Sequence, residues 1–159
     1  MSDSSDTDQP ELPALGFATD LSDQDRKDLG SYGEFITAME GDMLIEEKKP
    51  QNELFLIVFG NFHVQTENTG RVVLLGHLKS GDTVGEINIF DPGNASASVV
   101  ARTLGQVWKI DRTKLENFLE AHPQAAARLL VGVATQLSKR LRKTNDKVAM
   151  VRESMLDSF

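Results

Sequence analysis

The spacing of hydrophobic positions divides the chain into a strand-rich middle and helical ends. Residues 54–59 form an unbroken apolar run whose length and aromatic and β-branched content predict a strand buried on both sides. Residues 62–66 alternate apolar and polar side chains, which predicts a half-buried strand. Asn68-Thr69-Gly70 predicts a hairpin turn before a returning strand at 71–75. Strands of this length with glycine turns, between about residues 34 and 110, predict a sandwich or barrel.

Helical signals flank that block. Ser22 followed by Asp23 and Asp25 predicts a helix start, because a serine cap and early acidic residues suit the positive end of a helix. We expect Leu29 to face inward, and Gly30 with Gly33 to end this helix. After the strands, Asp111 is expected to cap a helix that contains Leu115, Phe118 and Leu119, and a further helix starts at Pro123.

The last predicted helix is long and carries an apolar seam. Hydrophobic residues recur every three or four positions, close to a heptad pattern with one polar step at Thr144: Leu130, Val133, Leu137, Leu141, Val148, Val151 and Met155. The strand block can cover the first half of this seam, whereas nothing else in the chain covers the second half. We therefore expect a homodimer through the helix from Pro123 to about Met150, with a frayed tail as the alternative.

Composition narrows the possible functions. The 159 residues suggest one domain, and the absence of cysteine excludes disulfides, thiolate zinc sites and cysteine nucleophiles. No stretch approaches the ~20 apolar residues of a membrane span, and the acidic N-terminus is unlike a secretory signal, so we expect a cytoplasmic protein. The three histidines lack metal-ligand spacing, and no Ser–His–acid set assembles from the motifs. We expect neither a metal site nor an enzyme.

Charge is unevenly distributed along the chain, although the net charge is -7. Residues 3–25 carry only acidic charges, and residues 139–152 are mostly basic. The basic stretch is typical of a solvated helix face, and the alternative is a contact with an acidic partner. Nucleic acid is not an expected partner, because a net negative chain without a separate basic domain is a poor general DNA binder.

Three segments result from these patterns. We expect an acidic, disordered leader over residues 1–15, a strand-rich domain over 16–122, and a long helical dimerisation element over 123–159. The residues after the long helix are too few for a DNA-binding helix-turn-helix motif, so the domain is expected to stand alone.

Three motifs, in this order and spacing, give the middle segment a family resemblance: Gly41–Leu44, Leu54–Val64 and Leu78–Ile87. Together they resemble the cyclic-nucleotide-binding domain, a family that includes catabolite activator proteins and the regulatory subunits of protein kinase A. The resemblance covers about residues 21–142. It implies an α+β fold, an antiparallel β-roll of the double-stranded β-helix or jelly-roll type, flanked by an N-terminal helix and a long C-terminal helix.

The resemblance also assigns a ligand site to a phosphate cassette at residues 85–99. In the family, Gly85 and Glu86 begin a short helix whose backbone N–H groups face the cyclic phosphate, and the glutamate accepts a hydrogen bond from the ribose. Ile87 follows, and Asn88 replaces a small residue. An arginine about nine residues after the glutamate clamps the phosphate, and this position is Ala95. Ser96 and Ser98 occupy positions that donate further hydrogen bonds.

Loss of the clamp predicts weak nucleotide binding. A charge-assisted bidentate contact contributes about 1.5–3 kcal/mol, so its absence weakens binding roughly tenfold to a hundredfold. We expect a pocket with no fixed positive charge, in which Glu86 braces the cassette as an alternative to holding a ligand. An arginine from elsewhere, such as Arg71, Arg102 or one from a partner chain, would restore the site.

The sequence therefore predicts a stand-alone, non-catalytic regulatory module with a degenerate phosphate cassette. We expect no cofactor, and we expect the module to act through protein–protein interaction with a partner protein. The alternative is a second-messenger sensor that still binds cyclic AMP, cyclic GMP or cyclic di-GMP through a non-standard pocket.

Overall fold

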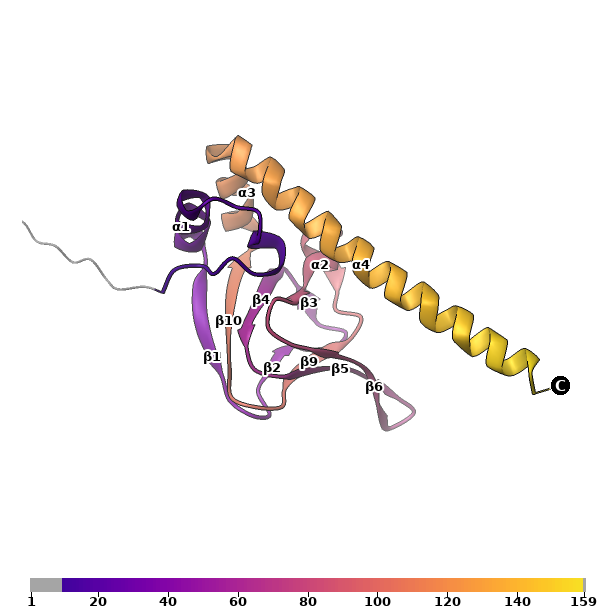
Figure 1. Cartoon of the computed structure of the whole chain (residues 1–159). Coiled ribbons are helices and arrows are strands. Elements are labelled where there is room, and N and C mark those ends of the chain that lie inside the picture. Colours follow the sequence, from indigo (N-terminus) through magenta and orange to yellow (C-terminus); the bar gives the residue numbers. More distant parts are fainter. Residues whose placement is uncertain (1–9, 159) are drawn as a thin grey trace, which may run out of the picture.

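The computed structural model describes residues 10–158, except the side chain of Ile87, and forms a β-roll from which one long helix projects (Figure 1). The helical elements, in chain order, are the short 3-10 helix η1 (Gly16–Ala18), α1 (Asp23–Tyr32), α2 (Glu86–Phe90), α3 (Arg112–Ala121) and α4 (Pro123–Leu156). The strands are β1 (Glu34–Ala38), β2 (Met43–Ile45), β3 (Pro50–Gln51), β4 (Glu53–Phe59), β5 (Phe62–Asn68), β6 (Arg71–Leu78), β7 (Thr83–Val84), β8 (Gly93–Asn94), β9 (Ser98–Ala101) and β10 (Gly105–Asp111).

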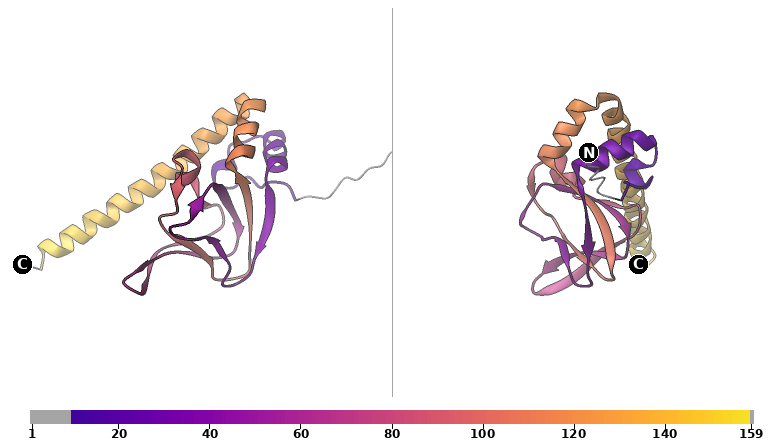
Figure 2. Two further views of the ribbon diagram at one scale, coloured as in Figure 1. Left: turned by 180° about the vertical axis from the view of Figure 1, so that it is seen from behind. Right: turned by 90° about the vertical axis from the view of Figure 1, so that its left-hand side faces the viewer.

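Two four-stranded antiparallel sheets form the roll, in the orders β1-β10-β4-β7 and β2-β9-β5-β6, and β3 pairs with β8 beside them. Helices α1 and α3 and the start of α4 cover one end of the roll, as two further views show (Figure 2). The predicted α+β fold, an antiparallel β-roll between an N-terminal helix and a long C-terminal helix, is confirmed.

The strands follow the predicted burial pattern. Residues 54–57 of β4 are all buried, because this strand lies inside the first sheet between β10 and β7. The hairpin turn between β5 and β6 places both Thr69 and Gly70 at positive φ, 50° and 78°, as a tight turn between twisted strands requires. Strand β6 continues to Leu78, beyond the predicted residue 75, because its pairing with β5 extends past a bulge beside Val64.

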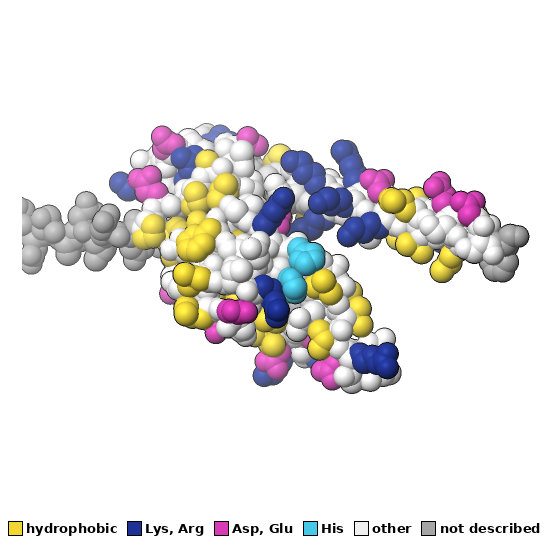
Figure 3. Space-filling view, turned by 60° about the horizontal axis from the view of Figure 1, so that its bottom comes forward, with side chains coloured by type: hydrophobic (Ala, Val, Ile, Leu, Met, Phe, Trp, Pro, Cys, Tyr) yellow, Lys and Arg dark blue, Asp and Glu magenta, His cyan; other side chains and the backbone are white. Residues whose placement is uncertain are grey.

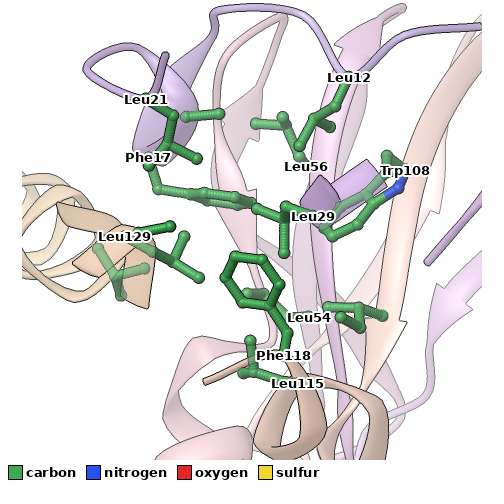
Figure 4. Close-up of a cluster of buried hydrophobic side chains, with 14 of the residues drawn as sticks. Leu12, Phe17, Leu21, Leu29, Leu54, Leu56, Trp108, Leu115, Phe118 and Leu129 are labelled. Atoms are coloured by element: carbon green, nitrogen blue, oxygen red, sulfur yellow. The ribbon is translucent and has the colours of Figure 1, made fainter. Parts of the chain in front are cut away.

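The principal hydrophobic core lies between the helices and the first sheet (Figure 4). Trp108 of β10 is fully buried there with Phe17 and Phe118. Leu12 is also buried in this cluster, so the packed part of the chain begins before residue 15. The first nine residues of the expected leader lie outside the described residues.

The predicted caps form as expected. The Ser22 hydroxyl accepts a hydrogen bond from the Asp25 backbone N–H at 3.1 Å, and the Asp111 carboxylate accepts one from the Lys114 N–H at 2.8 Å. Gly33 ends α1, but Gly30 lies inside the helix, contrary to the prediction. A Cβ at Gly30 would make an ordinary van der Waals contact with the Leu12 Cβ at 3.4 Å, so this helical position does not require glycine.

Helix α4 has a packed half and an exposed half. Leu129 and Val133 are buried against the roll, and Gly132 lets the helix backbone approach the Phe17 carbonyl closely. From residue 141 to residue 158 every described position is exposed, and the helix runs to Leu156. Within residues 10–158, none of the helices combines the length and apolar character needed to cross a membrane.

Candidate functional site

A small pocket lies between the predicted cassette, strands β5 and β6, and helix α4. Its volume is about 240 Å³, slightly below the roughly 300–1,000 Å³ of typical ligand pockets, so it suits a small ligand. Most of its wall is aliphatic: Ile45, Val64, Leu75, Leu78, Val84, Ala95, Ala97 and Val99. The remaining lining residues are Gly76, Gly85, Glu86, Asn88, Ser96 and Arg140.

Gly85 is the residue that turns the chain into this pocket. Its φ is 86°, and a Cβ at this position would overlap the backbone carbonyl of Glu53 on the neighbouring strand. Both facts require glycine at the junction between β7 and α2. The turn places Glu86 at the first position of α2, where the residue is only 4% exposed and lines the pocket.

Glu86 is paired with an arginine that lies 54 positions further along the chain. Arg140 of α4 donates from Nη1 to Oε1 of Glu86 and forms an ion pair with it. The expectation that the pocket contains no fixed positive charge is therefore wrong. Neither Arg71 nor Arg102 lines the pocket.

The position of Arg140 follows from the packing of α4. Val133 is buried against the roll, and a residue seven positions later, two helical turns on, lies on the same face. Arg140 is that residue, at the point where α4 leaves the roll beside the cassette. The first half of the predicted seam is covered only at Val133, because Leu130 and Leu137 are exposed and the helix packs through Leu129 and Val133 instead.

Three buried polar side-chain atoms have no hydrogen-bond partner within the described part of the chain, and two of them belong to this ion pair. They are Oε2 of Glu86, Nη2 of Arg140 and Oγ1 of Thr83, which lies three residues before Glu86. Each unsatisfied buried group costs about 1–3 kcal/mol. Both atoms of the pair are enclosed beside the pocket, with almost no accessible surface.

The structure brings five of the predicted site residues to one pocket: Gly85, Glu86, Asn88, Ala95 and Ser96. Asn88 donates from Nδ2 to the Asn94 carbonyl at 3.2 Å and so ties the two ends of the cassette loop together. Ala95 is 5% exposed and packs in the second hydrophobic cluster, so the wall at the clamp position is apolar. The side chain of Ile87 lies outside the described residues.

Ser98 has a different place from the one predicted. It does not line this pocket, and its hydroxyl accepts a hydrogen bond from the Glu47 backbone N–H at 2.9 Å. Glu47 in turn accepts from the Thr66 hydroxyl and from the Glu67 N–H, and these bonds lower the pKa of its carboxyl group. Ser98 and Glu47 therefore join the chain after β2 to the β5–β9 sheet.

The charges of the lining residues sum to zero. Glu86 and Arg140 are the only charged side chains among the described residues that line the pocket. Asp91, the other acidic residue of the cassette, is exposed and does not line it. The guanidinium that replaces the expected clamp is neutralised by the carboxylate beside it.

A family model described as the cyclic nucleotide-binding domain matches residues 36–122. The curated relatives include the CRP-like cAMP-activated global transcriptional regulator of Mycobacterium tuberculosis, which is 30% identical over 110 residues. That match covers 69% of this chain and 47% of the relative, so the chain spans about half the length of this curated protein.

Solved structures with the same fold include two bacterial domains. A cyclic nucleotide-binding domain from Methylobacillus flagellatus superposes with a TM-score of 0.77 at 24% identity, covering 82% of this chain and 74% of that one. The N-terminal domain of a transcriptional regulator from Streptomyces coelicolor has a TM-score of 0.70 at 28% identity, covering 86% and 95%.

The ion pair predicts a measurable coupling between α4 and the cassette. Because Glu86 is buried and Arg140 is partly exposed, Arg140→Ala should lower the free energy of unfolding by about 1–3 kcal/mol. Glu86→Gln should have an effect of similar size, and the double variant should lose less than the sum, because both single changes remove the same interaction. Denaturant unfolding measures all three. Lys139→Ala, at an exposed position one residue away, should change stability by less than about 0.5 kcal/mol, and additive losses at Glu86 and Arg140 would contradict the pairing.

Proposed function

The chain belongs to the cyclic nucleotide-binding domain family, and from this premise we propose that it is a non-catalytic regulatory module whose cassette is degenerate for cyclic mononucleotides. The observation that carries the proposal is the Glu86–Arg140 ion pair beside the apolar wall at Ala95. The curated relative from Mycobacterium tuberculosis and the Streptomyces coelicolor domain belong to transcriptional regulators, which supports a regulatory role.

Electrostatics opposes a cyclic phosphate in this pocket. An anion taken out of water needs a compensating charge, and at Ala95 the wall offers a methyl group in place of a guanidinium. Arg140 is the one cation among the described lining residues, and Glu86 already holds it. A bound phosphate would have to share Arg140 with Glu86 and would meet the repulsion of that carboxylate.

A panel of ligands tests this proposal directly. We expect no shift of the melting temperature with cyclic AMP, cyclic GMP or cyclic di-GMP at about 1 mM each. A ligand at 100 times its dissociation constant would add about 2.7 kcal/mol of stability. A dissociation constant of about 10 µM would therefore give a clear shift of the melting temperature. A clear shift with any of the three would contradict the degenerate cassette.

A second candidate function keeps the nucleotide, and the place of Arg140 in the pocket wall favours it. In this case Arg140 would leave Glu86 and clamp the phosphate from α4, so the module would be a second-messenger sensor with a non-standard pocket. The same panel decides between the two candidates, because a shift that Arg140→Ala abolishes would establish this one.

The proposed module acts through protein–protein contacts, first of all with a second copy of itself. The exposed half of α4 carries a row of apolar side chains that the described part of the chain leaves uncovered: Leu141, Val148, Val151 and Met155. The spacing is that of a helix-pairing seam. Basic side chains gather around the part of α4 that leaves the roll (Figure 3) and offer a contact for an acidic partner protein.

A cytoplasmic location belongs to the same proposal, since the curated bacterial relatives regulate transcription.

Light scattering tests the helix-mediated dimer. We expect twice the mass of one chain, and we expect the double change Val148→Asp with Val151→Asp to give a monomer, because it buries two charges in the seam. Ala149→Asp adds an acid on the opposite face of the same helix turn and should leave the dimer intact. A monomeric wild-type protein at high concentration would contradict the proposal.

A further inference from the structure

The fold brings together two histidines that lie far apart in the sequence. His63 of β5 and His77 of β6 are directly opposite each other across the hairpin, and their ring centres lie 4.6 Å apart. Histidine side chains gather on this surface of the molecule (Figure 3). We propose that this pair binds a divalent transition-metal ion, such as Cu²⁺, Ni²⁺ or Zn²⁺, on the outer face of the second sheet. The proposal does not depend on what the pocket beside the cassette binds.

The pairing of β5 with β6 holds both rings on the same face of the sheet, because directly opposite residues point the same way. That face is the outer one, since side chains alternate along a strand and the neighbouring Phe62 is fully buried. His63 is half-buried and His77 is exposed, so both rings are accessible to an ion from solution. The two strands therefore preorganise a chelate of two histidines.

The separation of the rings suits one shared metal ion. Imidazole nitrogens bind Zn²⁺ at about 2.0–2.1 Å, which places the centres of two rings on one ion roughly 4.5–5.5 Å apart. The observed 4.6 Å lies in this range. Because His77 is exposed, its ring can turn to aim a nitrogen at the ion without displacing packed side chains.

The ring nitrogens are available to a metal. No side-chain hydrogen bond or ion pair among residues 10–158 involves either ring, whereas the third histidine, His122, lies 3.8 Å from the Asp28 carboxylate. Partial burial, the neighbouring His77 and the charge of Arg102 lower the pKa of His63. The neutral imidazole is the form that binds a metal, so this lowered pKa reduces the competition from protons.

Two imidazoles select the class of ion. Imidazole suits Cu²⁺, Ni²⁺ and Zn²⁺, whereas Mg²⁺ and Ca²⁺ prefer oxygen ligands. Among the described residues, no group of three or more His, Cys, Asp or Glu side chains is placed to hold a metal ion, so water would fill the other positions. The exposed Arg102 is close enough to influence His63 and repels a cation there, so we expect a moderate affinity.

A metal ion on this pair would also hold one wall of the pocket beside the cassette. Val64 follows His63 in the chain, and Gly76 and Leu78 flank His77, and all three of these neighbours line the pocket. Strand β6 is at the edge of its sheet and, among the described strands, pairs with β5 alone. An ion that links the two strands on the outer face would therefore limit their movement at the inner face.

Isothermal titration of the full chain without an affinity tag tests the proposal, with Cu²⁺, Ni²⁺, Zn²⁺ and Mg²⁺ as ligands. We expect one ion per chain, with Cu²⁺ bound most tightly and no binding of Mg²⁺. His77→Asn should weaken Zn²⁺ binding at least about tenfold, because a second ligand on the same scaffold acts at a high effective concentration. His122→Asn, at the histidine outside the pair, should leave the affinity unchanged.

A change of charge beside the pair tests the location of the ion. Arg102→Gln removes the cation that opposes binding and should tighten Zn²⁺ binding by about two- to tenfold. Arg71→Gln removes the same charge at the far end of β6, opposite Asn68 at the hairpin turn, and should leave the affinity unchanged. Equal effects of these two variants would contradict a site at the histidine pair.

Proton NMR of the histidine rings needs only the wild-type chain and so remains decisive if a variant fails to fold. Zn²⁺ should shift the ring signals of His63 and His77 together and leave those of His122 in place. Absence of saturable binding, shifts confined to other residues, or a Zn²⁺ affinity that His77→Asn leaves intact would overturn the proposal.

Discussion

The ion pair between Glu86 and Arg140 connects the predicted cassette to the long helix α4. Glu86 belongs to the short helix of the cassette, and Arg140 lies where α4 leaves the β-roll. On the N-terminal side of Arg140, α4 is held by apolar packing against η1 and the roll. On its C-terminal side the helix is exposed. A change in the pairing of Glu86 therefore affects α4 at the point where its packed half meets its exposed half.

The pair ties the cassette to the long helix, because Glu86 begins α2 and Arg140 belongs to α4. While the pair is intact, it holds α4 against the cassette. A ligand that took Arg140 away from Glu86 would release it. The exposed apolar side chains of α4 lie beyond this point, on the half of the helix that does not pack against the roll.

The sequence was sufficient for the fold because its determinants are local. The apolar run at residues 54–57, the hairpin turn at Thr69 and Gly70, and the caps at Ser22 and Asp111 each specify one element through their nearest neighbours. The family resemblance then supplied the β-roll architecture and the flanking helices. The pocket was predictable in part, since Gly85, Glu86, Asn88, Ala95 and Ser96 come from one continuous segment.

The rest of the site depends on contacts between segments far apart in the chain. Arg140 reaches Glu86 because α4 packs across the roll. The residues of the cassette alone do not indicate this partner. Ser98 turns to the backbone of Glu47 because β2 and β9 are neighbours in the second sheet, a pairing that the residues around Ser98 do not reveal. Leu12 joins the core through contacts with residues of η1, α1 and β10.

Hydrogen exchange at the cassette measures the central claim, that Arg140 holds the cassette and α4 together. The Ile89 N–H bonds to the Gly85 carbonyl at 3.2 Å within α2, and its protection reports the stability of this short helix. We predict that Arg140→Ala speeds exchange at this amide by about tenfold, beyond any effect on global unfolding, while Lys139→Ala leaves the exchange rate unchanged. Equal exchange in the wild-type protein and in Arg140→Ala would contradict the account.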